Sequence, residues 1–196
     1  MTHSKIIKNE TVYDGPVFSV DKLDILLKSS EPKDLLINRD LVRKAPCVVV
    51  MIKNTTNDTI VLCNEYRTGA NGYSLGLPAG GINPNELPMS AAIREVREET
   101  GFTPTVIEDL GAAYSSMGFT NELVHYFYAE VKGVAEPQIL DHDEAITVVE
   151  KPFREFGSVL ASGTMPAAHA HTCFLKFLLT SRFNRHPFVE LGQSFI

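Results

Sequence analysis

Three glutamates near the middle of the chain have the residue type and the spacing to hold a metal ion. Glu95, Glu98 and Glu99 fall within five residues of a segment, residues 88–100, that is predicted to be a helix. At about 100° per residue, all three acids fit within an arc of about 100°. They are expected along the edge of a separate apolar stripe that faces the core, formed by Met89, Ala92, Ile93 and Val96.

This arrangement of acids lowers the stability of the helix predicted to carry them. Like charges three or four residues apart destabilise a helix, and the acids approach its C-terminus, where the helix dipole disfavours anions. A local cost of this kind is expected where function overrides stability. Clustered carboxylates suit a hard divalent cation such as Mg²⁺ or Mn²⁺, which could orient a diphosphate and acidify a water. Taken alone, however, "REVREE" is also typical of a solvated helix face.

The wider spacing decides between these interpretations. From Gly80 to Phe102 the chain resembles the signature of the Nudix hydrolases at every defined position, which are Gly80, Glu86, Arg94, Glu95, Val96, Glu98, Glu99, Gly101 and Phe102. Residues 62–81, 115–130 and 141–149 are similar to stretches of the ADP-ribose pyrophosphatase branch. The resemblance implies an α/β fold, the Nudix α/β/α sandwich around a mixed β-sheet. It also implies hydrolysis of a nucleoside diphosphate linked to another group, with Mg²⁺ or Mn²⁺.

The resemblance assigns expected roles around the metal. Glu95 and Glu99 would be direct ligands, together with the backbone carbonyl of Ala79, and Glu98 would bind directly or through water. Arg94 would orient the glutamates. Glu86 would tie the loop to the helix, although an ordinary loop–helix salt bridge would look the same.

Further matches concern the substrate and the proton. Arg67 matches an arginine near the substrate phosphates, with a surface ion pair to Glu65 as the alternative. Phe18 matches an aromatic that stacks on adenine from the partner subunit's arm, with a core phenylalanine as the alternative. Two loop acids, Glu122 and Glu144, match acids that flank the site, although a loop acid is usually solvated.

Glu144 is predicted to be the general base, because a metal-bound helix glutamate is a poor base. Glu98 is the main rival for that role, and Glu122 is a weaker one. Gly118 matches a substrate-binding loop glycine, but Met117 stands where the branch commonly has proline. That departure argues against a narrow ADP-ribose assignment and leaves the metal site untouched.

Composition limits the partners. The chain has 196 residues, 44% hydrophobic content and a net charge of −6, which disfavours nucleic-acid or anionic membrane surfaces and leaves room for a cation-bridged phosphate ligand. The three cysteines form no CxxC pair, and the N-terminus lacks the apolar core of a signal peptide. We therefore expect a reduced cytoplasmic protein with neither zinc nor a membrane span.

The order of elements suggests three regions. Residues 18–27 and 34–44 carry partly alternating strand patterns, and residues 1–44 are expected to form an amino-terminal β arm used for homodimerisation and substrate contact. Residues 45–181 are expected to form the Nudix domain. It would contain a hairpin over 45–67, the helix over 88–100, three further strands and two closing helices. Residues 182–196 would be a surface tail.

Three functions remain open from the sequence. The favoured one is a metal-dependent pyrophosphatase of ADP-ribose or a related ADP-sugar, yielding AMP and a sugar phosphate. A second is a Nudix hydrolase of dinucleotides such as diadenosine polyphosphates or NADH. The third is a catalytically silent Nudix domain that senses nucleotides, which the complete set of glutamates argues against.

Overall fold

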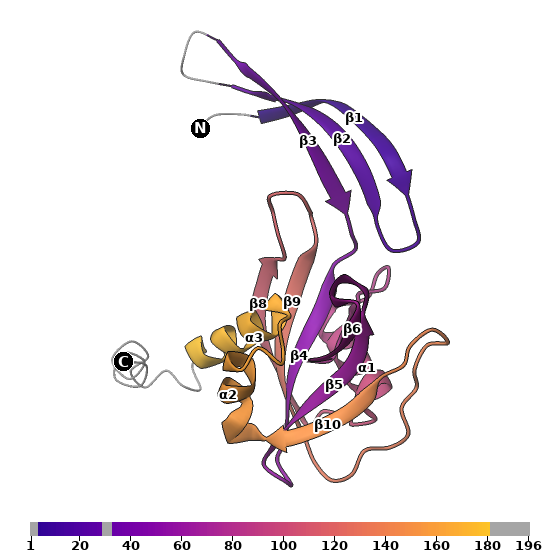
Figure 1. Ribbon diagram of the computed structural model, residues 1–196, viewed down its shortest axis with the longest axis vertical. Helices are drawn as coiled ribbons and strands as arrows, with labels where there is room; N and C mark the ends of the chain where they lie inside the picture. The colour runs from indigo at the N-terminus through magenta and orange to yellow at the C-terminus, as the bar shows by residue number, and fades with distance from the viewer. Residues whose placement is uncertain (1–3, 29–32, 181–196) are drawn as a thin grey trace. The chain divides into compact units, whose positions relative to one another are not determined.

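The computed structural model describes residues 4–28 and 33–180 (Figure 1). The expected surface tail over 182–196 lies outside them. The chain divides into two compact units, Met1–Pro46 with Ala113–Val124, and Cys47–Ala112 with His125–Ile196. Within the described residues, no helix has the length and apolar character needed to cross a membrane.

The first unit is built on a three-stranded antiparallel sheet, which we call the arm sheet. It has the order β1-β2-β3, with β1 at Ser4–Asp14, β2 at Ser19–Leu27 and β3 at Leu35–Arg43. Side chains alternate between the two faces of such a sheet. Every residue of β1 is exposed, and two shifts in its pairing register with β2 interrupt its ladder. The alternating patterns correctly predicted β2 and β3, but they did not predict the continuous 11-residue run of β1.

The connection between β8 and β9, residues 115–122, belongs to the same unit. Val42 at the end of β3 donates a backbone hydrogen bond to Phe119 (2.8 Å) and accepts one from Asn121 (3.2 Å). The side chain of Asn121 also accepts a hydrogen bond from the Lys44 backbone N–H (2.9 Å). These bonds tie the connection to the end of β3.

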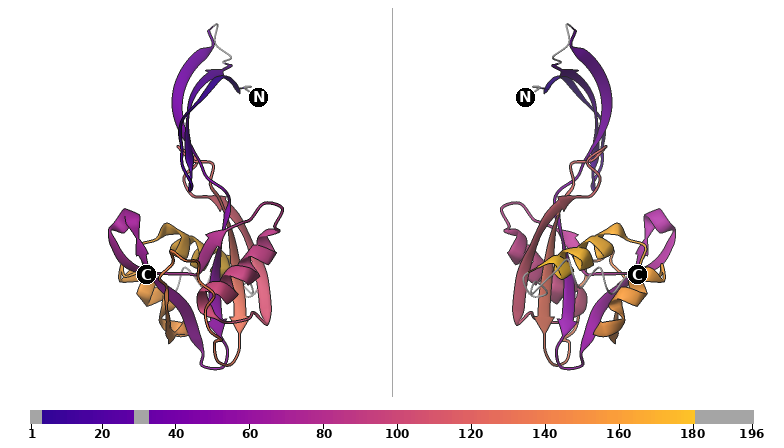
Figure 2. Two further views of the ribbon diagram at one scale, coloured as in Figure 1. Left: turned by 90° about the vertical axis from the view of Figure 1, so that its right-hand side faces the viewer. Right: turned by 90° about the vertical axis from the view of Figure 1, so that its left-hand side faces the viewer.

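The second unit is a sheet covered by helices on both faces (Figure 2). The strand order is β10-β5-β4-β9-β8, while β6 pairs with β5 and β7 pairs with β4. The strand bounds are β4 Cys47–Asn54, β5 Thr59–Arg67, β6 Gly72–Gly76, β7 Ala79–Gly81, β8 Val106–Tyr114, β9 Leu123–Val131 and β10 Thr147–Pro152. The helices are α1 Pro88–Thr100, α2 Phe156–Ala161 and α3 Ala168–Leu179, with short 3₁₀ turns at Thr68–Ala70 and Phe153–Glu155.

The central strand β4 explains the layering. Its residues from Val48 to Ile52 are at most 2% exposed, because alternate side chains meet different helices. Val48, Val50 and Ile52 pack with α1 in one apolar cluster. On the other face, α3 packs against the sheet, with Cys173 touching the Phe127 carbonyl and Phe177 stacked on Tyr128 at 4.7 Å.

Helix α1 begins and ends where its sequence predicts. Pro88 occupies the first turn, and Gly101 adopts the left-handed conformation (φ 73°) and donates its N–H to the Arg97 carbonyl at 2.9 Å. The expected buried face, however, was only partly correct, because Ala92 and Val96 are buried as predicted but Met89 and Ile93 are not. Met89 and Ile93 are 44% and 40% exposed, whereas the buried residues are Ala91, Ala92, Glu95, Val96, Glu99 and Thr100. The helix is rotated so that two of the carboxylates point inward, between α1 and the sheet.

Candidate metal and substrate site

Glu99 is the most buried of the three helix glutamates. Its side chain lies between α1 and the sheet, and the residue is 3% exposed. The backbone N–H of Ala79 on β7 donates to Glu99 Oε2 at 3.0 Å, and the Cys63 thiol on β5 lies 3.8 Å from the same oxygen. Three elements that are distant in sequence therefore meet at this carboxylate.

Glycine is required at position 80 for a steric reason. A Cβ built on Gly80 would overlap the carboxyl group of Glu95, so β7 can approach α1 this closely only without a side chain. At the neighbouring Gly81, a Cβ would meet nothing within 4 Å. The first glycine of the pair thus makes room for a functional side chain, whereas the second does not.

Arg94 joins the loop, the strand and the helix through one guanidinium group. Its Nε and Nη2 donate to the two carboxylate oxygens of Glu86, each at 2.9 Å, and Nη2 also donates to the Gly81 carbonyl at 2.8 Å. Its Nη1 donates to Glu95 (2.6 Å) and Glu98 (2.9 Å). Glu86 accepts a further bond from the Asn83 N–H at 2.9 Å. One arginine therefore fixes three glutamates relative to one another.

The burial of Glu95 and Glu99 disfavours the charged form of their carboxyl groups. Burial, followed by the charge of Glu95, raises the pKa of Glu99 to about 8. Burial also raises the pKa of Glu95, even though Arg94 opposes the shift. A cation would relieve both effects, because an opposite charge favours the ionised carboxylate. The surroundings of Glu95 and Glu99 thus favour a bound cation.

The donor set also fits a hard divalent cation. Carboxylate oxygens and a backbone carbonyl are the ligands that Mg²⁺ and Mn²⁺ prefer. Among residues 4–28 and 33–180, however, no group of three or more His, Cys, Asp or Glu side chains is arranged as a metal site. Glu95 and Glu98 are instead both paired with Arg94, at 2.6 Å and 2.9 Å.

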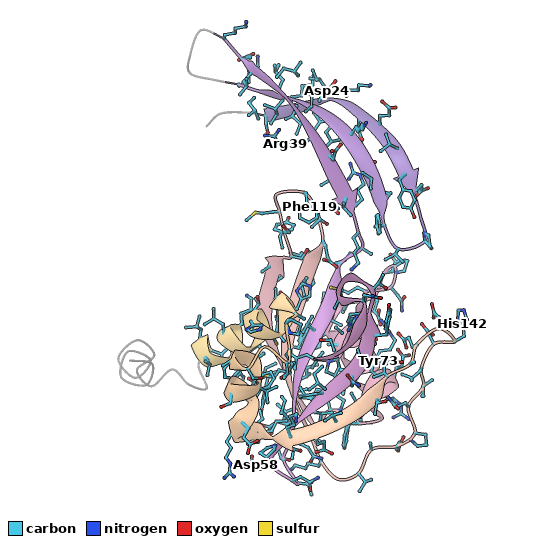
Figure 3. All side chains as sticks on the ribbon, in the orientation of Figure 1. Asp24, Arg39, Asp58, Tyr73, Phe119 and His142 are labelled. Atoms are coloured by element: carbon cyan, nitrogen blue, oxygen red, sulfur yellow. The ribbon has the colours of Figure 1, made fainter. Side chains whose placement is uncertain are left out.

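A hollow of about 180 Å³ opens beside the helix glutamates. It is lined by Gly80, Gly81, Asn83, Arg94, Glu95, Glu98, Ile139, Asp141 and Glu144. Glu144 comes from the connection between β9 and β10, where its carboxylate accepts a hydrogen bond from the Asp141 N–H at 3.0 Å. His142, labelled in Figure 3, lies on the same stretch with its side chain 95% exposed. The structure thus brings Glu144 to the same hollow as Glu95 and Glu98.

Arg67 and Glu65 form a pair on β5. Their side chains meet at 2.6 Å, which is the ion pair that the sequence offered as the alternative for Arg67. Alternation places Glu65 on the same face of β5 as Cys63, which touches Glu99. Burial raises the pKa of Glu65, Arg67 lowers it, and the charge of Glu144 raises it further. Glu65 therefore belongs to the acidic surroundings of the site, and the alternation of Cys63, Glu65 and Arg67 is the sequence signal that could have identified it.

Three of the expected substrate residues, Phe18, Gly118 and Glu122, lie in the first unit. Phe18 is 41% exposed and stacks at 5.4 Å on Tyr13, so it is not a core phenylalanine. Glu122 is buried and paired with Lys44 at 2.5 Å, so it is not a solvated loop acid. Gly118 is in open space, next to the 81% exposed Met117.

Known proteins share this fold and motif. A model of the NUDIX domain matches residues 43–169. This chain belongs to the Nudix family of hydrolases. A solved structure described as an ADP compounds hydrolase aligns with a TM-score of 0.70 and 25% identity, over 89% of this chain and 91% of that one. It confirms the α/β Nudix fold with a mixed sheet and the three-stranded amino-terminal sheet.

Three named proteins are similar in sequence to this chain. The chain is 32% identical over 148 residues to the ADP-ribose pyrophosphatase of Bacillus subtilis, covering 74% of this chain and 80% of the relative. It is 31% identical over 149 residues to the methanol dehydrogenase activator of Bacillus methanolicus, with 74% and 77% covered. It is 32% identical over 134 residues to the GDP-mannose pyrophosphatase of Yersinia enterocolitica, with 64% and 69% covered.

Proposed function

We propose that this Nudix protein is a nucleotide-sugar pyrophosphatase that hydrolyses ADP-ribose or a related ADP-sugar to AMP and a sugar phosphate. The observation that carries the proposal is the group of glutamates fixed by Arg94 beside a polar hollow. The names of the relatives support a nucleotide-sugar substrate. The ADP moiety rests on the ADP-ribose pyrophosphatase and the ADP compounds hydrolase.

Mg²⁺ or Mn²⁺ would be held by the Ala79 carbonyl, Glu95 and Glu99, with Glu98 as a ligand directly or through water. When bound, such an ion neutralises phosphate charge and acidifies water. Arg94 and Glu86 would keep the ligands oriented through the bonds described above. Arg67, on the same face of β5 as Cys63, would bind a substrate phosphate while Glu65 holds its guanidinium in place.

The bond broken would lie between phosphorus and the bridging oxygen, with a water oxygen attacking phosphorus. Glu144 would accept the proton of that water, because it lines the hollow and is not one of the proposed metal ligands. Glu98, the rival base, is instead bonded to Arg94 at 2.9 Å and is itself a proposed metal ligand. Hydrolysis in isotopically labelled water should place the label on a phosphate product, whereas label on the sugar hydroxyl would contradict attack at phosphorus.

The substrate is tested by assaying purified protein with Mg²⁺ against ADP-ribose, GDP-mannose, NADH and diadenosine polyphosphates. We expect the highest kcat/KM for ADP-ribose or another ADP-sugar, with AMP among the products. A clear preference for GDP-mannose or for dinucleotides would overturn the ADP-sugar assignment and retain the pyrophosphatase. Tight nucleotide binding without turnover in the presence of any metal ion would favour a nucleotide sensor. That alternative is kept because one relative is named as an activator, the methanol dehydrogenase activator.

We further propose that the protein is a cytoplasmic homodimer whose arm sheet contributes to the partner's site, with Phe18 stacking on adenine and with Glu122 and Gly118 contacting substrate. The exposed arm sheet supports this, because three strands without a covering layer are marginally stable alone. Three free cysteines suit a reducing compartment. Deleting residues 1–44 should give poorly folded or inactive protein, and an active monomeric truncation would contradict the dimer.

A further inference from the structure

The connection between β9 and β10, residues 132–146, is fastened to the C-terminal end of α1. The Ile139 N–H donates to the Glu98 carbonyl at 2.9 Å, and the Glu136 N–H donates to the Gly101 carbonyl at 2.9 Å. The last carbonyls of a helix have no partner within it, so they need donors from elsewhere. Here those donors come from the connection that carries Glu144.

Gln138 makes the central attachment. Its side-chain amide nitrogen donates both to the Glu99 carbonyl and to the Ile146 carbonyl, the latter at 3.3 Å. An amide NH₂ has two hydrogens, so one side chain can serve both acceptors at once. Gln138 thereby links the end of α1 to the residue that immediately precedes β10.

This link closes the segment between Gln138 and Ile146 into a short loop with fixed ends. The loop contains Asp141 and Glu144, which line the hollow beside the helix glutamates. Fixing the ends of a short loop removes most of the conformations that its middle could otherwise adopt. The position of Glu144 relative to α1 therefore depends on a side chain that does not itself line the hollow.

We propose that Gln138 is a positioning residue that holds the loop carrying Glu144 in place against the C-terminal end of α1, where the helix glutamates lie. The proposal rests on the function proposed above, in which Glu144 accepts a proton from water. Without the two amide donors, the Glu99 and Ile146 carbonyls lose their shared partner, and the Ile146 end of the loop is no longer tied to α1 through Gln138. A base displaced by about 1 Å can lose about 10²-fold in rate.

The first test requires no activity. Amide hydrogen exchange is compared between wild type, Gln138→Met and Val134→Ala. Methionine keeps the length of the side chain but removes both donors, and Val134, 93% exposed on the same connection, is the matched control. We expect Gln138→Met to speed exchange over residues 139–146 and the end of α1, with the sheet unchanged. Unchanged protection in that segment would overturn the proposal, whether or not the protein turns over ADP-sugars.

The second test is a kinetic double-mutant cycle between positions 138 and 144. We expect Gln138→Met to lower kcat about 10- to 100-fold with KM nearly unchanged, and to add little when Glu144→Gln is already present. A merely structural cap would instead reduce kcat by the same factor in both backgrounds. Independent effects, or full kcat in Glu144→Gln, would overturn the proposal. If Gln138→Met fails to fold, Gln138→Asn replaces it, because its shorter amide cannot span both carbonyls.

Wild-type protein separates this proposal from the proposed function. If wild type shows no hydrolysis of any nucleotide sugar, the proposed function fails, while the exchange experiment still decides whether Gln138 fixes the loop. If wild type is active and Val134→Ala matches it, any loss in Gln138→Met is specific to the two donors.

Discussion

The arm sheet and the sheet of the second unit differ in how far their side chains are buried. In β4, the five residues from Val48 to Ile52 are at most 2% exposed, because helices cover both faces. In β1, all 11 residues are exposed. Rigid placement of buried carboxylates needs the first kind of environment, where neighbours fix each rotamer. The second kind offers surface for contacts that form later, with substrate or another subunit.

The largest expected effect belongs to the second unit. Glu99→Gln should lower turnover with Mg²⁺ by orders of magnitude, because it removes a proposed metal ligand. In melts at mildly acidic pH, where burying Glu99 costs little, it should leave the melting temperature near that of wild type, since glutamine can still accept the Ala79 N–H bond. Steady-state kinetics and thermal melts test both parts. Glu136→Gln is the matched control, because that side chain is exposed and pairs with Arg97 at the surface. Turnover of Glu99→Gln within about a factor of two of wild type would reject the metal role.

A matched pair of truncations tests the difference in burial itself. Ile52→Ala, at a residue with 0% exposure, should lower the free energy of unfolding by about 2–5 kcal/mol because it leaves a cavity. Leu36→Ala in the arm sheet, at 53% exposure, should change it by at most about 0.5 kcal/mol. Urea denaturation measures both values. A large, concentration-dependent effect of Leu36→Ala would mean that another copy of the chain covers this part of the arm sheet in solution.

The two motif glycines provide a smaller and more local test. Gly80→Ala should lower turnover about 10- to 100-fold, because its methyl group displaces the Glu95 carboxyl group. Gly81→Ala should be close to wild type, since nothing lies within 4 Å of the added Cβ. Both variants are compared by kcat/KM and by the Mg²⁺ concentration at half-maximal rate. Equal losses in the two variants would point to a backbone requirement of the loop instead of steric displacement of Glu95.

The smallest expected effect concerns how the free energy of unfolding depends on pH when no divalent ions are present. Folded Glu99 keeps its proton up to a pKa of about 8, whereas the unfolded side chain releases it near 4.5. The folded state therefore binds more protons in this window, so the free energy of unfolding should fall as pH rises through it. One pKa unit corresponds to about 1.4 kcal/mol, so the two values set an upper limit of about 5 kcal/mol, and we expect a fall of about 1–3 kcal/mol because relaxation and water at the site screen part of it. Urea melts in EDTA measure it, and Glu99→Gln should flatten the slope, while an unchanged slope would contradict the assignment to Glu99.

Much of the second unit could be predicted because its signals are local. Pro88 and Gly101 set the limits of α1, and the β-branched run before "NTTND" predicts the β4–β5 hairpin. The motif spacing predicted the family, which the NUDIX match confirms. The roles of individual site residues remain predictions, to be decided by the variants above.

What could not be predicted depends on contacts between distant residues. A helical wheel ranks side chains by polarity, so it placed Met89 inside and the acids at the edge, whereas the structure buries Glu95 and Glu99 against β7 and β5. Glu65 was considered only as a partner for Arg67, and nothing near Gln138 in the sequence indicates that its amide reaches the Glu99 carbonyl. Local sequence rules cannot indicate which distant side chain will donate a hydrogen bond to a given backbone carbonyl.

The two register shifts in β1 have a consequence for solubility. An exposed edge strand can recruit strands from other molecules and extend into aggregates. In β1, the shifts between Ile6 and Lys8 and between Thr11 and Tyr13 interrupt the regular spacing of backbone donors and acceptors that a growing sheet would need. Along its β1 edge, the arm sheet can therefore present apolar side chains on its faces and still be poorly suited to open-ended polymerisation.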